Sequence, residues 1–565
     1  MKYFLIICCL LGINPASVSA ETTDTAVLDQ TVVDVAEPPV EAVTDSLPGP
    51  TDPIPELLRQ LTEKKLTKAI PVLEQLASLG GEKFLPLFRT LLAGELYYVK
   101  KTRQLVGMRE QDDEKTYLDV QTRELVAGLG KRDVKKIRVN NRLRGFLRGV
   151  IARIQLSSSD ATVREEAVRS LLGDLDRETV AQIQAVRHQE SDAAVQQVMD
   201  LALAMYALES GETQSERLEA VAVLSGNLED DVRNVLRLHA EMETDHSRYD
   251  AKVTAAAKKA LKKIEGKIEF YGFVDQLFFG LSLGSVLLLA AIGLAITFGV
   301  MGVINMAHGE MIMLGAYTTY IIQMLFPNAI EYSLLLAIPA AFAVSGLMGI
   351  AIERGVIRFL HGRPLETLLA TFGISLILQQ LVRTVISPQN VPVSTPEWMS
   401  GTLDINPVLS LTLNRLYILA FALLVFFALM MILKKTNLGL NVRAVSQNRA
   451  MARAMGVRSD WVDAMTFGLG SGIAGIAGVA LSQLTNVGPN LGQSYIIDSF
   501  MVVVFGGVGN LWGTLVAAFS LGIANKFLEP ATGAVLASIL VLIFIILFIQ
   551  KRPKGLFPQK GRAAE

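Results

Sequence analysis

Cysteine is nearly absent from this 565-residue chain, which contains only Cys8 and Cys9. Both lie in the apolar run Tyr3–Leu11, which follows Lys2 and precedes small residues that end at Ala20. This pattern predicts a secretory signal peptide over residues 1–20. The alternative, a first transmembrane helix, is disfavoured because the run is too short to cross about 30 Å of hydrocarbon. A mature chain cut after Ala20 would hold no cysteine, which excludes disulfides and thiolate metal sites.

The chain also lacks a nucleotide-binding loop, since no segment matches Gly-x-x-x-x-Gly-Lys-Ser/Thr. We therefore expect no ATP hydrolysis by this chain and no cofactor in it. His188, His239 and His246 show no metal-ligand spacing, so we expect them at the surface and predict no metal site.

Charge is distributed unevenly. Residues 21–275 contain 35 Lys/Arg and 43 Asp/Glu, whereas residues 276–565 contain 17 and 11. The first half is charged enough for a solvated domain, and the second is too apolar to be one. We expect a soluble domain followed by a polytopic membrane domain.

The region before the membrane domain has two parts. Residues 21–52 are rich in Thr, Val, Pro, Asp and Glu without periodicity, which indicates a disordered acidic linker. Over residues 53–268, apolar side chains recur at three- and four-residue steps, which predicts a soluble helical domain. Similar segments begin at Asp160, Asp192 and Asp250, where each Asp is placed to cap a helix. A HEAT-type stack of helix pairs and an ordinary helical bundle both fit this repeat.

The membrane domain, residues 270–555, contains nine apolar segments, so the predicted fold class is all-α with about eight or nine spans. The segments are 276–299, 304–326, 333–352, 367–386, 415–433, 462–484, 496–511, 513–528 and 534–550. The seventh and eighth are short and contain glycine, which predicts broken or re-entrant helices.

Arginine and lysine placement predicts the orientation. The connections after the third and fifth segments and the tail 556–565 are basic, whereas connections 327–332, 387–414, 485–495 and 529–533 contain no Lys or Arg. By the positive-inside rule the basic connections and the C-terminus are cytoplasmic. A signal peptide places the N-terminal domain outside, and an odd number of spans then agrees with both signals. We predict a multi-pass protein of the bacterial inner membrane with a periplasmic N-terminal domain.

Two elements of the membrane domain carry the functional signal. The first is Asn305-Met306-Ala307-His308-Gly309-Glu310, whose polar side chains are costly in lipid and should face a protein interior or a polar path. The second is the basic connection from Lys434 to Asp460, where Val442–Ala454 is predicted to be helical and Gly439 and Gly456 mark turns. An ordinary basic loop is the alternative interpretation of this second element.

These motifs, together with Gly280–Val286, Ile352-Glu353-Arg354 and Val504–Asn510, occur in an order that resembles the branched-chain amino acid type of ABC permeases. The resemblance covers roughly residues 270–555. The phrase Arg443–Ala452 and the exported extension are similar to the urea-transporter branch of that family. The resemblance implies a heterodimer with a second, similar permease, two ATPase subunits that use ATP inside, and a periplasmic solute-binding protein outside. Membrane lipid is a further expected partner, and nucleic acid is not.

The resemblance also suggests roles for individual residues. Gly439, Arg443, Met451 and Gly456 are expected in the loop that couples to the ATPase. Broken-helix or path elements are expected at Asn305, His308, Glu310, Gly506, Gly507 and Asn510, with Gly509 beside them; close helix packing is the alternative for every glycine and the better one for Gly468, Gly472, Gly475 and Gly478.

The expected solute is urea or a short amide, with a branched-chain amino acid as the named alternative and a passive small-solute channel as the weaker one. A path for urea needs only neutral polar groups. Those available are Gln323, Thr371, Ser375, Gln379, Ser471, Gln483 and Asn486.

Overall fold

The computed structural model describes residues 53–63, 69–111, 114–120, 125–126, 129–130, 132–173, 175–241 and 251–557. The predicted signal peptide and acidic linker, Asp250 and His246 lie outside these residues. Two compact units meet in the chain at Ile268 and Glu269, and we call them the N-terminal unit and the membrane unit.

The N-terminal unit begins with helices and a small antiparallel sheet. The helices are α2 (Ile54–Glu63), α3 (Ala69–Gly80), η2 (Gly81–Phe84) and α4 (Leu85–Ala93), and the strands are β1 (Leu96–Val99), β2 (Leu105–Gln111), β3 (Glu114–Asp119) and β4 (Val134–Lys136). The strand order is β3-β2-β1-β4, with Leu96 opposite Gly107 and Met108 opposite Tyr117. The prediction that residues 53–268 are all helical is therefore wrong over this sheet. Its strands carry β-branched and aromatic residues, such as the buried Tyr98, Val106 and Tyr117, that favour pleated structure.

A helical array completes this unit. It contains α5 (Asn141–Gln155), α6 (Ala161–Leu171), α7 (Arg177–Arg187), α8 (Ala193–Ser210), α9 (Gln214–Leu224), α10 (Asp230–Glu241) and the first part of α11 (Ala251–Met301). Asp160 caps α6 and Asp192 caps α8 through their side-chain oxygens, as predicted, and Asp176 caps α7 in the same way. One apolar core joins these helices from Ala152 to Ile264. His188 is exposed, but the surface prediction for His239 is wrong, because its ring is buried and bonds the Val235 carbonyl.

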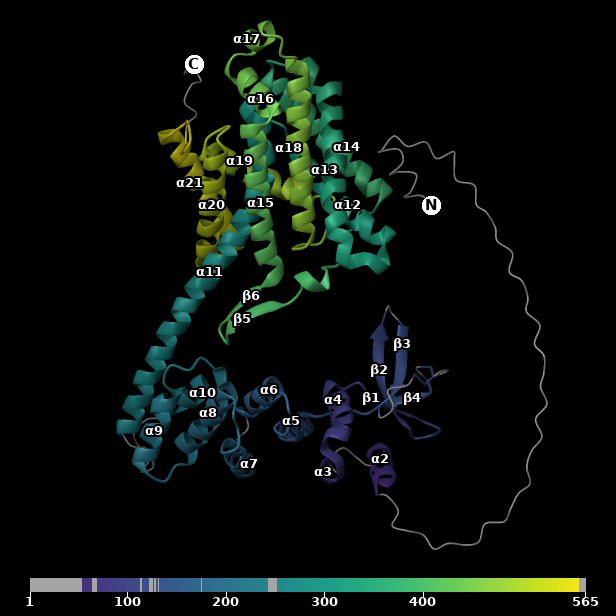
Figure 1. Ribbon diagram of the computed structural model, residues 1–565, viewed down its shortest axis with the longest axis vertical. Coiled ribbons are helices and arrows are strands. Elements are labelled where there is room, and N and C mark those ends of the chain that lie inside the picture. The colour runs from purple at the N-terminus through teal and green to yellow at the C-terminus, as the bar shows by residue number, and fades with distance from the viewer. Residues whose placement is uncertain are drawn as a thin grey trace, which may run out of the picture. The chain divides into compact units, whose positions relative to one another are not determined.

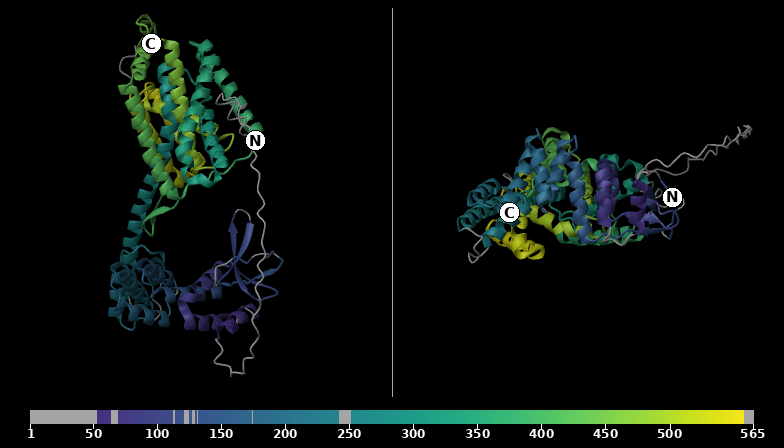
Figure 2. Two further views of the ribbon diagram at one scale, coloured as in Figure 1. Left: turned by 45° about the vertical axis from the view of Figure 1, so that its right-hand side comes forward. Right: turned by 90° about the horizontal axis from the view of Figure 1, so that it is seen from below.

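The membrane unit is a bundle of helices that run side by side (Figure 2). After α11 come α12 (His308–Leu325), η3 (Pro327–Ala329), α13 (Ile330–Gly355), η4 (Ile357–Leu360), α14 (Pro364–Val385), η5 (Glu397–Met399), the hairpin β5 (Thr402–Asn406) and β6 (Leu409–Thr412), α15 (Leu413–Lys435), α16 (Asn437–Gln447), α17 (Arg449–Ala454), α18 (Ser459–Ser482), α19 (Leu491–Gly506), α20 (Leu511–Thr532) and α21 (Ala534–Lys551). Helices α16 and α17 lie at one end of this unit and the hairpin at the other (Figure 1).

Within the described residues, seven helices are long and apolar enough to cross a membrane: α11, η3 with α13, α14, α15, α18, α20 and α21. An all-α polytopic membrane fold is confirmed. Two predicted spans fall short: α19 is a shorter apolar helix, and α12 begins with the polar residues His308 and Glu310. The prediction of a short eighth span is wrong, since α20 continues through Pro530 to Thr532.

Helix α18 is central to the bundle, and glycine allows its neighbours to approach it closely. A Cβ atom built on Gly475 would lie 2.5 Å from the Ala341 carbonyl oxygen on α13, and one on Gly478 would lie 2.0 Å from the Ile312 carbonyl oxygen on α12. Gly468 and Gly472 contact Ile350 and Phe342 on α13 in the same way. The packing role predicted for this glycine row is confirmed.

Candidate translocation site at the break between α11 and α12

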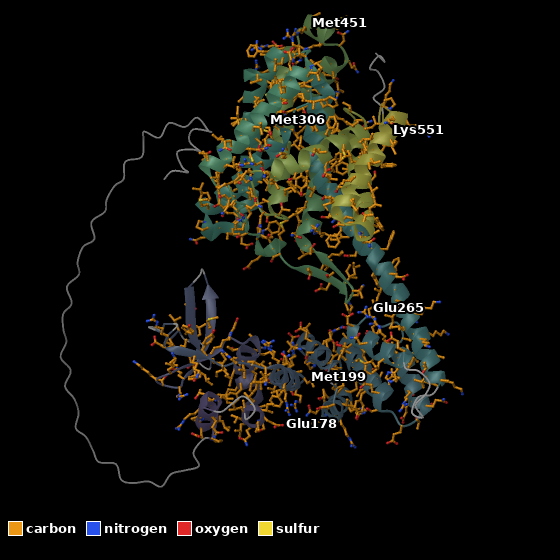
Figure 3. All side chains as sticks on the ribbon, turned by 180° about the vertical axis from the view of Figure 1, so that it is seen from behind. Glu178, Met199, Glu265, Met306, Met451 and Lys551 are labelled. Carbon is orange, nitrogen blue, oxygen red and sulfur yellow. The ribbon has the colours of Figure 1, made fainter. Side chains whose placement is uncertain are left out.

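The first polar motif lies where the helical backbone is interrupted. Helix α11 ends at Met301, Gly302 adopts a φ of 67°, and α12 begins at His308. Val303, Asn305 and Ala307 of the break are buried, and Figure 3 labels Met306 in the membrane unit. Backbone donors freed by the break are bonded by side chains: Asn305 Oδ1 accepts from the Ala307 N–H at 3.0 Å, and Thr371 Oγ1 accepts from the Met306 N–H at 3.1 Å.

His308 ties α12 to α11 instead of bonding the break. Its Nε2 lies 2.9 Å from the Ala290 carbonyl oxygen. A carbonyl can only accept, so Nε2 carries the hydrogen and Nδ1 presents a lone pair in the neutral ring. Gly293 makes room for this arrangement, since a Cβ there would lie 2.2 Å from the Gly470 carbonyl oxygen and 2.9 Å from His308 Cε1.

Glu310 faces a polar stripe on α14. Its Oε1 accepts from Ser375 Oγ and from Gln379 Nε2, each at 2.8 Å. Thr371, Ser375 and Gln379 are spaced four residues apart, so they share one face of α14. Three of the neutral polar residues expected along a path, Thr371, Ser375 and Gln379, therefore form hydrogen bonds with the α11–α12 motif.

Several atoms of this site are buried without a hydrogen-bond partner among the described residues. They are Asn305 Nδ2, His308 Nδ1 and Glu310 Oε2, joined by Tyr317 Oη and Ser471 Oγ. Unsatisfied polar groups at this depth are expensive, so they are retained where water or a solute bonds them or where the structure rearranges. The site offers an imidazole nitrogen, an amide, two hydroxyls and a carboxyl oxygen to such a solute.

The second predicted break lies between α19 and α20. Gly507 and Gly509 have φ values of 104° and 79°, and Asn510 Oδ1 caps α20 by accepting from the Trp512 and Gly513 N–H groups. Asn510 Nδ2 donates to the Phe557 carbonyl, so the C-terminal segment contacts this break. The two breaks are neighbours, because a Cβ on Gly299 of α11 would lie 2.5 Å from Gly509 Cα. Gly506 packs against Gly513 and provides no polar side chain.

The remaining neutral polar residues lie elsewhere. Gln323 donates to Ser333 and to the Ser394 carbonyl, and Asn486 is exposed. Gln483 is buried near the end of α18, where its backbone carbonyl oxygen accepts a hydrogen bond from the Asn414 side-chain amide. Among the residues that the structure describes, none of these three forms a hydrogen bond with Asn305, His308 or Glu310.

The basic connection forms two helices, not the single helix predicted over 442–454. Asn448 leaves helical geometry between α16 and α17, and its side chain caps α17 through the Met451 N–H at 2.9 Å. Gly439 packs on the end of α15, where a Cβ would lie 2.0 Å from the Leu433 carbonyl oxygen, and Arg443 bonds that same carbonyl. Gly456 ends α17 with a φ of 87°.

This connection presents apolar side chains at the tip of the membrane unit, where Figure 3 labels Met451. The exposed side chains, each more than half accessible, are Leu440, Met451 and Met455, and Trp461 follows at the start of α18. An apolar group of this kind on a basic surface is typical of a protein contact.

An ion-pair network that the sequence did not reveal anchors α17. Arg449 bonds the buried Asp463 carboxylate on α18 and donates to His361 Nε2 at 2.6 Å. Burial lowers the pKa of His361, and the Arg449 cation lowers it further, so the ring is neutral and accepts this bond. An acid at position 463 in an apolar span was the only signal that could have indicated the network.

No group of three or more His, Cys, Asp or Glu side chains placed to hold a metal ion occurs in the part of the chain that the structure describes.

The fold and the interrupted helices define a multi-pass membrane permease, and comparison with known proteins places it. The family described as branched-chain amino acid transport system / permease component matches residues 276–549. The branched-chain amino acid permease BraD of Pseudomonas aeruginosa is 30% identical over 297 residues, which cover 51% of this chain and 96% of that protein. LivH of Escherichia coli K12, also a branched-chain amino acid permease, is 29% identical over 297 residues, which again cover 51% of this chain and 96% of that protein.

The ribose import permease RbsC of E. coli K12 is 28% identical over 266 residues, covering 45% of this chain and 78% of that protein. No solved structure matches. The chain belongs to the branched-chain amino acid permease family of ABC importers. It is a membrane permease subunit and not itself an enzyme, and its family implies ATPase and binding-protein partners.

Proposed function

We propose that this chain forms an inner-membrane path for a branched-chain amino acid, driven by ATP that separate subunits hydrolyse. The similarity of residues 276–549 to branched-chain amino acid permeases carries this proposal. The partners are a second, similar permease, two ATPase subunits inside and a solute-binding protein outside. The signal peptide predicted over residues 1–20 favours a periplasmic N-terminal unit, and the basic connections favour a cytoplasmic C-terminus.

Urea is the second candidate solute. The permease match begins at residue 276, so the N-terminal unit lies outside the matched region. That extension and the sequence segment Arg443–Ala452 resemble the urea-transporter branch of the family and so favour urea. The groups around the α11–α12 break also suit a small neutral solute, because Asn305, Ser471 and Gln379 are uncharged donors and acceptors.

The α11–α12 break is proposed to line the path. Its buried polar atoms have room to exchange partners only if the surrounding helices move, and rigid-body rocking of helices is the common transporter mechanism. Helices α16 and α17 are proposed to receive that motion from the ATPase through Gly439, Arg443, Met451 and Gly456.

Uptake measurements separate the two solutes. Cells that contain the other transporter subunits, with and without this chain, are offered labelled leucine or labelled urea at low concentration. Loss of leucine uptake alone supports the first candidate, and loss of urea uptake alone supports the second. Unchanged uptake of both would refute the proposed function.

A further inference from the structure

A cavity of about 320 Å³, lined by polar and apolar side chains, lies between α11, α19, α20 and α21. It is located where α19 begins, α20 ends and α21 begins. The connections at that end, 485–495 and 529–533, contain no Lys or Arg, so the positive-inside rule places it outside the cytoplasm. The cavity is distinct from the α11–α12 break, since it includes none of Asn305, His308 or Glu310.

Three side chains that carry charge at neutral pH line the cavity, and Tyr495 lies with them. Lys526 Nζ and Glu529 Oε2 on α20 form an ion pair at 2.6 Å, with side chains 28% and 34% exposed. Asp498 on α19 has no hydrogen bond or ion pair with any residue that the structure describes. The cavity therefore holds two carboxylates and one ammonium, and one of the carboxylates is unmatched.

Structure alone does not account for Asp498. Asp498 is half-buried, its neighbours along the cavity include Met501, Val502 and Leu521, and an unpaired carboxylate beside apolar side chains is energetically costly. Lys526 and Glu529 pair with each other, whereas the Asp498 carboxylate pairs with no residue that the structure describes. Charged side chains within membrane segments commonly mark substrate or ion pathways.

The cavity also provides neutral polar atoms and an apolar wall. Asn525 Nδ2 donates to Ser538 Oγ at 3.3 Å, and Ser494 adds a second hydroxyl. Leu283 and Leu287 of α11 form part of the apolar wall of the cavity. A ligand with an N–H group, an oxygen acceptor and a small body fits this set.

We infer that this cavity is an outer solute site, in which Asp498 accepts hydrogen bonds from the solute's N–H groups and Lys526 donates to its oxygen. The inference rests on the proposed function and adds the residues that receive the solute on the outer side. The ammonium and carboxylate of an amino acid supply this chemistry, and so do the amide N–H groups and carbonyl of urea.

Site-directed labelling tests the site directly, because the chain has only two cysteines. In a Cys8→Ser, Cys9→Ser background, Ser538→Cys is labelled from outside with 2-aminoethyl methanethiosulfonate in the assembled transporter. Solute at about ten times its dissociation constant should slow labelling roughly tenfold. Ser400→Cys, near the hairpin and outside the cavity, should label at an unchanged rate. Ser494→Cys provides a second cavity position if Ser538→Cys does not insert.

The result that overturns the outer site is equal labelling of Ser538→Cys and Ser494→Cys with and without leucine or urea, in a transporter that still imports one of them. The proposed function would survive that result. A transporter that imports neither solute would overturn both.

Asp498→Asn distinguishes the two solutes. The substitution keeps an oxygen acceptor of the same shape and removes the charge. If the solute is leucine, its apparent KM should rise roughly tenfold or more, because a charge-assisted bond is lost. If the solute is urea, the KM should rise less, by about two- to threefold, because a neutral amide oxygen still accepts its N–H groups but more weakly than a carboxylate. An unchanged KM for the imported solute would contradict the inference.

Discussion

Glu310 and Gln379 lie 69 residues apart in the chain, and the Gln379 amide donates a 2.8 Å hydrogen bond to the Glu310 carboxylate. This contact links the start of α12 to the middle of α14. It fixes the polar motif beside the α11–α12 break in the bundle interior, and Ser375 donates to the same oxygen.

Gln379→Leu should destabilise the membrane unit by roughly 1.5–3 kcal/mol, because a buried carboxylate loses one of its two donors. Thermal unfolding of the purified protein in detergent measures the loss. Gln380→Leu is the matched control, since Gln380 is the next residue, is exposed, and bonds only within its own helix. Equal stability of the two variants would show that the Glu310 contact is unimportant.

Arg449→Leu should lower solute uptake strongly while the protein still inserts, because the buried Asp463 carboxylate loses its cation and α17 loses its anchor. Arg453→Leu is the comparison variant. Its ion pair with Asp460 is about half exposed on both sides, so its removal should cost about 0–1 kcal/mol. Uptake and membrane content are measured together, and similar uptake by both variants would refute the anchoring role.

Gly475→Ala should destabilise the bundle by roughly 1–3 kcal/mol, because the added methyl would meet the Ala341 carbonyl oxygen and Ser345 Oγ, each at 2.5 Å. Gly373→Ala in α14 has nothing within 4 Å and should be neutral or slightly stabilising. Unfolding temperatures of the two variants measure the difference. Tolerance of Gly475→Ala would mean that α18 and α13 are packed less closely than described.

The N-terminal unit should lose stability in acid. Arg164 binds Glu190 through two hydrogen bonds of 2.7 and 2.8 Å and thereby lowers the pKa of that carboxyl from 4.5 to about 2. A carboxyl whose pKa is lower in the folded state than in the unfolded state contributes its full stabilisation of the fold at a pH above the unfolded pKa. That contribution is lost as the pH falls from about 4.5 towards 2.

Hydrogen exchange of the full-length chain, corrected for intrinsic rates, tests this at the start of α8, where Glu190 accepts from the Ser191 and Asp192 N–H groups. Protection should decrease over that pH window. Arg164→Met should show low protection throughout, whereas Arg153→Met, whose partner Glu178 is 69% exposed, should behave as the wild type. A flat profile in the wild type would contradict the prediction.

The sequence predicted what local patterns determine. Asp160 and Asp192 were recognisable as helix caps because a cap needs only an Asp before a periodic stretch. The seven membrane helices followed from apolar length, whereas the spans predicted at α12 and α19 fall short, α12 because its first turn carries His308 and Glu310 and α19 because it is short. The sheet was missed because Tyr97 and Val106 belong to short strands within a region whose surroundings are helical.

The contacts that make the site depend on the tertiary fold. Thr371, Ser375 and Gln379 were recognised only as neutral polar residues, since nothing in the sequence pairs them with Met306 or Glu310 more than 60 residues away. The same holds for Arg449, His361 and Asp463, which come from three separate elements. An acid in an apolar span, as at Asp463 and Asp498, signals that a partner exists without indicating which one.

The most direct test of the proposed ATP-driven path is solute accumulation in proteoliposomes that contain the complete transporter and its binding protein, with ATP or a non-hydrolysable analogue at the ATPase side. We predict that the labelled solute rises above its starting concentration on the receiving side with ATP and does not with the analogue, and that Arg443→Glu abolishes the rise. Equilibration of the solute to the same level with either nucleotide would identify a passive channel and contradict the account.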